Sequence, residues 1–148
     1  MGINEEPRLV PMVGDPDDHR PQSRWATLAD ADVESLGAIM EEIAPGDRIP
    51  LHTHPIDEVI LYRSGSATIT IGDDRCEVVP GTVAFIPRGT PHRTENVGIE
   101  PASVFAVFPS RTVGIRYLER NPAPGTEGDD PRSPATFDFR TGDVLTKD

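Results

Sequence analysis

The sequence is poor in cysteine and in long apolar runs, and each shortage excludes a class of protein. Cys76 is the single cysteine among the 148 residues, so an internal disulfide framework is excluded. No apolar run approaches the ~18–20 residues that a membrane-spanning helix requires. The first twenty residues are acidic and contain proline, and they have no apolar segment of the kind found in secretory signals. We therefore expect a cytoplasmic protein.

Positive charge is also scarce. The sequence has 14 Lys and Arg against 25 Asp and Glu, which gives a formal net charge of −11. Nucleic acids and anionic membranes bind clusters of basic side chains, and no basic stripe offsets the acidic excess. We therefore expect no nucleic-acid partner and no membrane partner. The acidic residues near the two ends favour solubility.

Proline, by contrast, is abundant. The sixteen prolines amount to about twice the usual frequency of ~5%, and many of them gather near the ends, within residues 1–21 and 122–134. We interpret these ends as extended arms with little regular structure of their own. Apolar residues within them favour partial docking, on the barrel or on a partner subunit. The predicted organisation is an N-terminal arm (residues 1–23), a barrel domain (24–120) and a C-terminal arm (121–148).

The central part of the chain is predicted to form short strands separated by turns. The sequence "ATITI" (67–71) alternates strictly and is followed by "GDD", a strong hairpin signal. Turn residues recur at intervals of roughly 8–12 residues and no long helical stripe occurs, which is typical of an antiparallel sandwich or barrel. The predicted strands are 36–43, 49–54, 57–63, 67–71, 75–79, 82–86, 91–96, 102–108 and 112–119.

Two of the four histidines, His52 and His54, stand one residue apart in the sequence "PLHTHPIDEVI". Residues two apart in a strand point to one face, so both rings can be directed at one point. Glu58 begins the next predicted strand, and an adjacent antiparallel strand about 5 Å away can reach the same point. His92, which follows a turn, is available as a fourth ligand. Three imidazoles and a carboxylate suit iron, manganese, cobalt, nickel, copper or zinc, but not calcium.

Spacing alone leaves a second interpretation open, because histidines are also common on exposed polar strands. Two segments, however, resemble the two motifs of the cupin superfamily. "GDRIPLHTHPIDEVILYRSG" (46–65) matches G-x5-HxH-x3,4-E-x6-G, and "GTVAFIPRGTPHRTEN" (81–96) matches G-x5-PxG-x2-H-x3-N, each at every fixed position. The motifs occur in the expected order with a short region between them. The resemblance covers about residues 36–118.

The resemblance implies an all-β fold, a single jelly-roll barrel (a double-stranded β-helix) with a metal near its centre. It also implies one divalent transition metal per chain, bound by the residues at the motif's ligand positions, which are His52, His54, Glu58 and His92. The motif glycines fall where strands reverse, so we expect positive φ angles there. Asn96 is expected to tie a turn through its amide. Small cupins often form homodimers with exchanged terminal segments, so a homodimer is a further expectation.

Other polar residues are weaker candidates. Tyr62 shares a strand face with Glu58 and Ile60, and it is either a pocket phenol able to donate a proton or a rim tyrosine with its hydroxyl in water. One of Glu41 and Glu42 is expected to face the barrel interior, where an acid could serve as a general base. Ile60 is a candidate substrate contact, Cys76 is expected to pack, and His19 is expected at the surface. The arginines that could bind an anionic substrate are Arg48, Arg88, Arg93 and Arg116.

Three functions are compatible with the predicted metal site. Four protein ligands in an octahedral field leave two positions open, which suits dioxygen activation or bidentate binding of a substrate. We favour a non-haem dioxygenase, because the ligand set resembles that of acireductone and quercetin dioxygenases. The first alternative is a redox-neutral isomerase, lyase or polyketide-type cyclase, and the second is a cupin that binds a small ligand without catalysis. Resemblance in fold does not decide between them.

Overall fold

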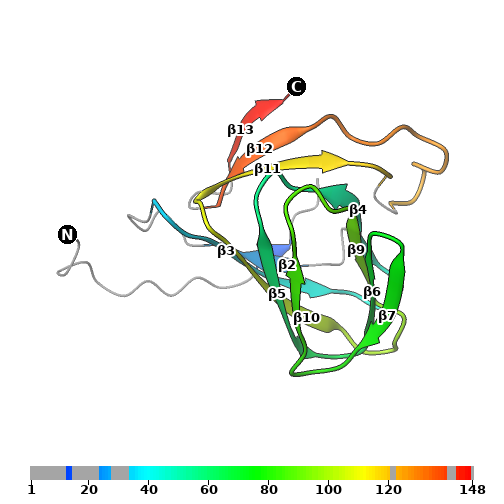
Figure 1. Cartoon of the computed structure of the whole chain (residues 1–148). Coiled ribbons are helices and arrows are strands. Elements are labelled where there is room, and N and C mark those ends of the chain that lie inside the picture. The colour runs from blue at the N-terminus through cyan, green and yellow to red at the C-terminus, as the bar shows by residue number, and fades with distance from the viewer. Residues whose placement is uncertain (1–12, 15–23, 28–33, 121–122, 140–142, 148) are drawn as a thin grey trace.

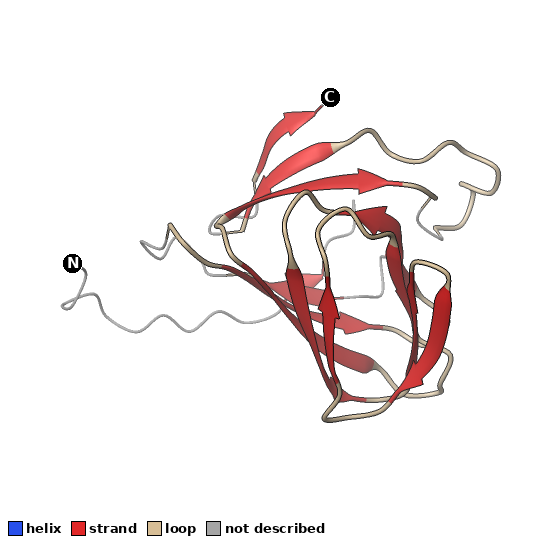
Figure 2. Ribbon diagram, in the orientation of Figure 1, coloured by secondary structure: helices blue, strands red, loops and turns tan. Residues whose placement is uncertain are grey.

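The structure is a computed structural model that describes residues 13–14, 24–27, 34–120, 123–139 and 143–147. These residues form strands and loops and contain no helix (Figure 2). In chain order the strands are β1 (Val13–Gly14), β2 (Arg24–Ala26), β3 (Gly37–Ile43), β4 (Arg48–Thr53), β5 (Glu58–Ser64), β6 (Ala67–Ile71), β7 (Asp74–Val78), β8 (Val83–Ile86), β9 (His92–Glu95), β10 (Ala102–Phe108), β11 (Thr112–Tyr117), β12 (Ala135–Asp138) and β13 (Val144–Lys147).

The strands form two antiparallel sheets that enclose one core (Figure 1). One sheet has the order β1-β2-β3-β10-β5-β8, and the other has the order β13-β12-β11-β4-β9-β6-β7. Neighbours in a sheet are often distant in sequence, as in β3 beside β10 and β4 beside β9, so the chain crosses repeatedly between the two sheets. This is the jelly-roll barrel that the resemblance to cupins implies, and it agrees with the antiparallel sandwich or barrel predicted from the strand pattern.

All nine predicted strands are present, with ends that differ by at most two residues. The alternation that predicted them is visible in β10, where every second residue is buried. This agreement is expected because short strands between glycine and proline turns carry a strong local signal.

The C-terminal segment differs from the expectation of little regular structure. Its described residues include β12 and β13, which extend the sheet beyond β11 (Figure 1). The sequence signal for these strands was weak because each spans only four residues and a proline-rich stretch precedes them. Phe139, directly after β12, packs against the core, which agrees with the expected docking. Most of the predicted N-terminal arm, including His19, lies outside the described residues.

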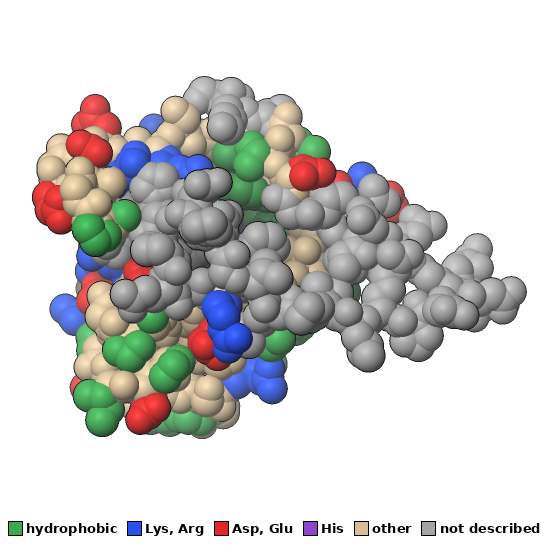
Figure 3. All heavy atoms as spheres, turned by 180° about the vertical axis from the view of Figure 1, so that it is seen from behind, with side chains coloured by type: hydrophobic (Ala, Val, Ile, Leu, Met, Phe, Trp, Pro, Cys, Tyr) green, Lys and Arg blue, Asp and Glu red, His purple; other side chains and the backbone are tan. Residues whose placement is uncertain are grey.

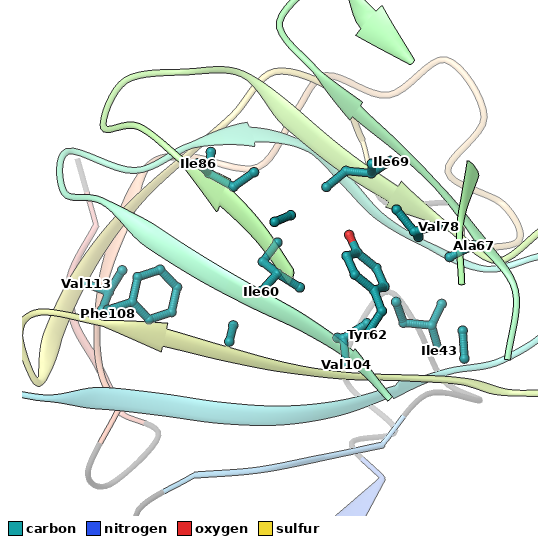
Figure 4. Packing of buried hydrophobic residues seen from close by; sticks show 13 residues of the cluster. Ile43, Ile60, Tyr62, Ala67, Ile69, Val78, Ile86, Val104, Phe108 and Val113 are labelled. Atoms are coloured by element: carbon teal, nitrogen blue, oxygen red, sulfur yellow. The ribbon is translucent and has the colours of Figure 1, made fainter. Parts of the chain in front are cut away.

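The core runs along the barrel between the two sheets (Figure 4). Phe108 and Val113 lie at one end of it, and Ile43, Ala67 and Val78 lie at the other (Figure 4). Cross-strand neighbours on the inward face, such as Val104 opposite Tyr62 and Ala106 opposite Ile60, fill the space between the ends. The hydrophobic stabilisation of the barrel comes from burying these side chains.

Two further expectations can be compared with the fold. The motif glycines Gly46, Gly65, Gly81 and Gly89 have φ angles of 80°, 77°, 91° and 75°, which confirms the predicted positive values. The expectation that Cys76 packs is wrong, because its side chain is exposed on β7, an edge strand. Among the described residues, no helix is long and apolar enough to cross a membrane.

Candidate metal centre

The four predicted ligands come together although they lie in both sheets and in the connection between them. His52 lies in β4 directly opposite His92 of β9, so these two residues are cross-strand neighbours in one sheet. Glu58 begins β5 in the other sheet, and His54 lies in the connection between β4 and β5. All four residues are buried, and their ligand atoms lie within 4.8 Å of one another. No histidine of the described residues is visible on the face shown in Figure 3, in keeping with this burial.

Backbone carbonyl groups determine which nitrogen of each imidazole faces the cluster. Nδ1 of His52 lies 2.6 Å from the carbonyl oxygen of Pro50, and Nδ1 of His92 lies 2.9 Å from that of Thr90. Nδ1 of His54 lies 2.7 Å from the carbonyl oxygen of Gly114. A carbonyl only accepts hydrogen bonds, so each Nδ1 is the protonated donor. In the neutral ring, Nε2 then carries a lone pair, as in histidines that bind metals.

These lone pairs point at one another. The Nε2 atoms of His52 and His54 lie 3.1 Å apart, and Nε2 of His92 lies 2.7 Å from Oε2 of Glu58. Oε2 of Glu58 is also 3.3 Å from Nε2 of His54. With neutral rings, four buried acceptors converge with no hydrogen between them, which is unfavourable at low dielectric. A divalent transition metal supplies the missing positive charge, and three imidazoles with one carboxylate form a suitable ligand set. The residues present therefore fit a metal ion.

The local electrostatics favour the protonation states that a metal requires. Burial, followed by repulsion from His92 and His54, lowers the pKa of His52 well below its ordinary value, so this ring is neutral at neutral pH. Burial alone would raise the pKa of Glu58, but it is lowered to about 2 when His54 and His92 are protonated, because their charged rings then donate hydrogen bonds to this carboxylate. The site therefore offers an ionised carboxylate beside a neutral imidazole.

Two turns are tied together next to the ligands. The amide of Gly89 donates a hydrogen bond of 2.8 Å to the carbonyl of His54. The amide of Arg88 donates one of 2.9 Å to Oδ1 of Asp57. The turn before β9 therefore supports the turn after β4, which explains the turn residues of both motifs. Asn96 acts structurally, since its amide nitrogen donates to the carbonyls of Ile43 and Glu100 at 2.8 Å each.

An aromatic contact borders the cluster on one side. The rings of His54 and Phe108 pack edge to face with centroids 5.0 Å apart, and Phe139 stacks on Phe108 at 5.2 Å. Sequence reasoning did not identify either phenylalanine as a neighbour of the site. Phe108 carries the signal of an ordinary alternating strand, and Phe139 lies far along the chain in a segment with little pattern.

Tyr62 lies inside the barrel rather than at its rim. Only 4% of its surface is exposed, and its hydroxyl is 2.8 Å from Oγ1 of Thr94. Burial raises the pKa of Tyr62 to about 12, although the hydrogen bond with Thr94 opposes this shift. The alternative of a rim hydroxyl in water is therefore wrong. Ile60, on the same face of β5, is part of the hydrophobic core beside Tyr62 (Figure 4).

Strand alternation distinguishes the two glutamates of β3. Glu41 is buried on the inward face, where its cross-strand partner is the core residue Val104. Glu42 lies on the other face, where its carboxylate accepts two hydrogen bonds, of 2.8 and 2.9 Å, from Nη2 of Arg24. Glu41 is therefore the inward acid that the alternation predicts.

Two of the four candidate arginines pair with a glutamate in the structure. The guanidinium of Arg48 lies 3.0 Å from Glu119, and that of Arg93 lies 2.9 Å from the same carboxylate. Arg88 and Arg116 are exposed. These observations give Arg48 and Arg93 a structural role that sequence reasoning did not identify, because Glu119 is distant in sequence from both.

Comparison with known proteins agrees with the motifs. The family model described as "Cupin domain" matches residues 39–108. Germin-like protein 1 of Brassica napus is 33% identical over 84 residues, which cover 53% of this chain and 41% of that protein. The tetracenomycin polyketide synthase protein TcmJ of Streptomyces glaucescens is 29% identical over 94 residues, which cover 62% of this chain and 63% of that protein. The chain thus spans less than two thirds of the length of these relatives.

Solved structures share the fold at low sequence identity. A cupin structure from Silicibacter pomeroyi, described as a sugar phosphate isomerase, has a TM-score of 0.63 and 20% identity, covering 91% of this chain and 82% of that one. Oxalate decarboxylase from Bacillus subtilis has a TM-score of 0.58 and 24% identity, covering 66% of this chain and 27% of that one. Residues 39–108 thus match the cupin family model, and the barrel formed around the two complete motifs has the cupin fold.

Proposed function

We propose that this protein is a mononuclear metal-dependent enzyme that acts on a small organic molecule, with His52, His54, Glu58 and His92 as the metal ligands. The observation that carries the proposal is the convergence of four buried acceptor atoms within 4.8 Å. A bound divalent transition metal would supply Lewis acidity and, if it is iron, manganese, nickel or copper, also redox chemistry with dioxygen.

The surrounding residues support chemistry that depends on the metal rather than on a protein base. Tyr62 stays protonated at neutral pH because its pKa is about 12, so it could donate a proton but not remove one. Glu41 is the remaining candidate base, because it is buried on the inward face of β3. Phe108 packs on His54 and keeps water from one side of this ligand. Among the enzyme classes, we propose a non-haem dioxygenase first.

The second candidate is a redox-neutral cyclase or isomerase. It is favoured by the similarity to a polyketide synthase protein and by the shared fold of a cupin described as a sugar phosphate isomerase. Oxygen consumption separates the two candidates. The purified protein, loaded in turn with iron, manganese, nickel, copper, cobalt and zinc, would be tested in an oxygen electrode with enols, flavonols and diketones. Metal-dependent oxygen uptake is expected for a dioxygenase, and product formation without uptake would favour the redox-neutral candidate.

We also propose that the chain forms a homodimer through the outer face of the sheet that ends in β8. Val83 and Phe85 are 62% and 58% exposed there, although both are apolar. Each of them begins a row of cross-strand neighbours that runs over the outer face from β8 through β5 and β10 to β3, and neither row contains a charged residue. A second copy suits this face because a chain with a net charge of −11 repels itself through most other surfaces. The rows are Val83-Leu61-Phe105-Met40 and Phe85-Val59-Val107-Ala38.

Light scattering after size-exclusion chromatography tests this interface. We expect a dimer for the wild type and a monomer for Phe85→Glu. The matched control is Ile99→Glu, since Ile99 is 90% exposed but lies outside both rows. A monomeric wild type, or a dimeric Phe85→Glu variant, would contradict the proposed interface. Exchange of the terminal arms and a cytoplasmic location both stay predictions.

A further inference from the structure

The three imidazoles of the proposed metal site are oriented in two different ways. His52 and His92 each donate to a carbonyl only two residues earlier in the chain, so residues next to them in sequence orient them. His54 instead donates to the carbonyl of Gly114, which is 60 residues away. The orientation of His54 therefore depends on where β11 lies relative to the connection between β4 and β5.

The part of β11 that carries Gly114 pairs with β12 rather than with β4, the strand that contains His52. Only Arg116 and Tyr117, at the end of β11, pair with β4. Residues 112–115 pair with β12, where Gly114 lies opposite Thr136. The backbone of Phe139 adds another link, because its amide donates a hydrogen bond of 2.7 Å to the carbonyl of Arg111.

Gly114 also lies close to the residue that follows His54. A Cβ at position 114 would be 3.0 Å from Cγ and 3.2 Å from Cδ of Pro55. Both distances are shorter than ordinary van der Waals contacts. A methyl group here would therefore push β11 and the Pro55 ring apart by a few tenths of an ångström. We expect such a shift to change the hydrogen bond between Gly114 and His54, because Pro55 directly follows His54 in the chain.

The C-terminal segment reaches His54 by a second route. The ring of Phe139 stacks on Phe108, and the ring of Phe108 packs edge to face on His54. The segment after residue 111 is thus connected to His54 in two ways, by the hydrogen bond to Gly114 and by the aromatic packing of Phe139 on Phe108.

We propose that Gly114 is a positioning residue for the metal ligand His54, and that the pairing of β11 with β12 tunes the metal affinity of the site. This inference rests on the proposed metal-binding function of the cluster. It assigns a role to the C-terminal strands that the cupin motifs do not contain. Groups that orient a metal-binding histidine typically change metal affinity by about 10–100-fold when they are altered.

Cobalt binding to the full-length protein tests the proposal without an activity assay. Co²⁺ would be titrated into metal-free protein, with the visible absorption spectrum reporting ligand geometry and a competing chelator reporting affinity. We expect Gly114→Ala to weaken Co²⁺ binding by about tenfold or more and to change the spectrum. The control is Gly98→Ala, because a Cβ at position 98 would meet other atoms at no less than 3.5 Å. This control should bind Co²⁺ as the wild type does.

Three results would overturn the proposal, and they can be distinguished. Failure of the wild type to bind Co²⁺ would refute the metal site itself. Wild-type binding with an unchanged spectrum and affinity in Gly114→Ala would refute the positioning role alone. If Gly114→Ala does not fold, judged by circular dichroism of the metal-free protein, Phe139→Leu replaces it. That variant keeps the backbone link but removes the stacked ring, and an unchanged affinity and spectrum would refute the proposed tuning of the site by the C-terminal segment.

Discussion

Replacing Tyr62 by Phe should remove a loss of stability that the wild type shows at alkaline pH. The unfolded chain ionises a tyrosine near pH 10.0, whereas the folded chain keeps Tyr62 protonated up to about pH 12. Between these values the folded state binds the proton more tightly, so the free energy of unfolding falls as pH rises. The expected loss is about 1.4 kcal/mol at pH 11 and about 2 kcal/mol at pH 12, since one pKa unit corresponds to ~1.4 kcal/mol.

The Phe variant also loses the hydrogen bond between Tyr62 and Thr94, which costs about 1 kcal/mol at every pH. The wild type should therefore be more stable at pH 8, and the order should reverse near pH 11, where the wild type has lost about as much. Urea unfolding at a series of pH values from 8 to 12 measures both curves. The assay is favourable because Lys147 is the only lysine of the sequence, so few other side chains titrate in this range.

Absorbance at alkaline pH provides an independent measurement of the same ionisation. Tyr117 is the second tyrosine of the sequence, and Tyr117→Phe leaves Tyr62 as the only phenol observed. The remaining transition should then occur near pH 12 in the folded protein. A difference in stability between wild type and Tyr62→Phe that stays constant from pH 8 to 12 would refute the reasoning, because it would mean that the hydroxyl is hydrated in the folded state.

Three further predictions concern the site and the barrel. His52→Ala combined with His54→Ala should abolish metal in elemental analysis of the purified protein, whereas His19→Ala should retain it; metal content unaffected by the double substitution would contradict the ligand assignment. Removing metal with a chelator should lower the thermal unfolding temperature, and metal at 100 times its Kd should restore about 2.7 kcal/mol; a chelator-insensitive protein would contradict a bound metal. Gly65→Ala should destabilise the barrel more than Gly46→Ala in denaturant unfolding. Both impose about 1–2 kcal/mol of strain at positive φ, but only position 65 places the Cβ 2.4 Å from a backbone oxygen, that of Pro101. Equal losses would refute this close approach.

The sequence was informative about the barrel because its signals are local. Alternating strands between glycine and proline turns predicted all nine central strands, and each turn is encoded within a few residues. The convergence of His52, His54, Glu58 and His92 was also predictable, since each occupies a fixed position in one of two contiguous motifs. The C-terminal strands were not predicted, because β12 and β13 are short and depend on pairing with β11 rather than on their own pattern.

Other features depend on contacts between distant residues, so only the tertiary structure decided them. Alternation required that one of Glu41 and Glu42 face inward, and the placement of β3 beside β10 selected Glu41. Arg48 was an open candidate until Glu119, which is 71 residues away, proved to be its partner. Tyr62 could face water or the core until the fold buried it against Thr94.

The histidine cluster combines features that the sequence predicts with features that only the tertiary structure decides. The sequence by itself determined which residue types converge, because ligand spacing follows from strand periodicity and the motif. The tertiary structure decided which nitrogen of His54 faces the cluster, because the carbonyl that orients this ring belongs to Gly114 on a strand 60 residues away. A local sequence pattern specifies the identities of the ligands, whereas their orientation depends on packing between strands that the chain brings together only on folding.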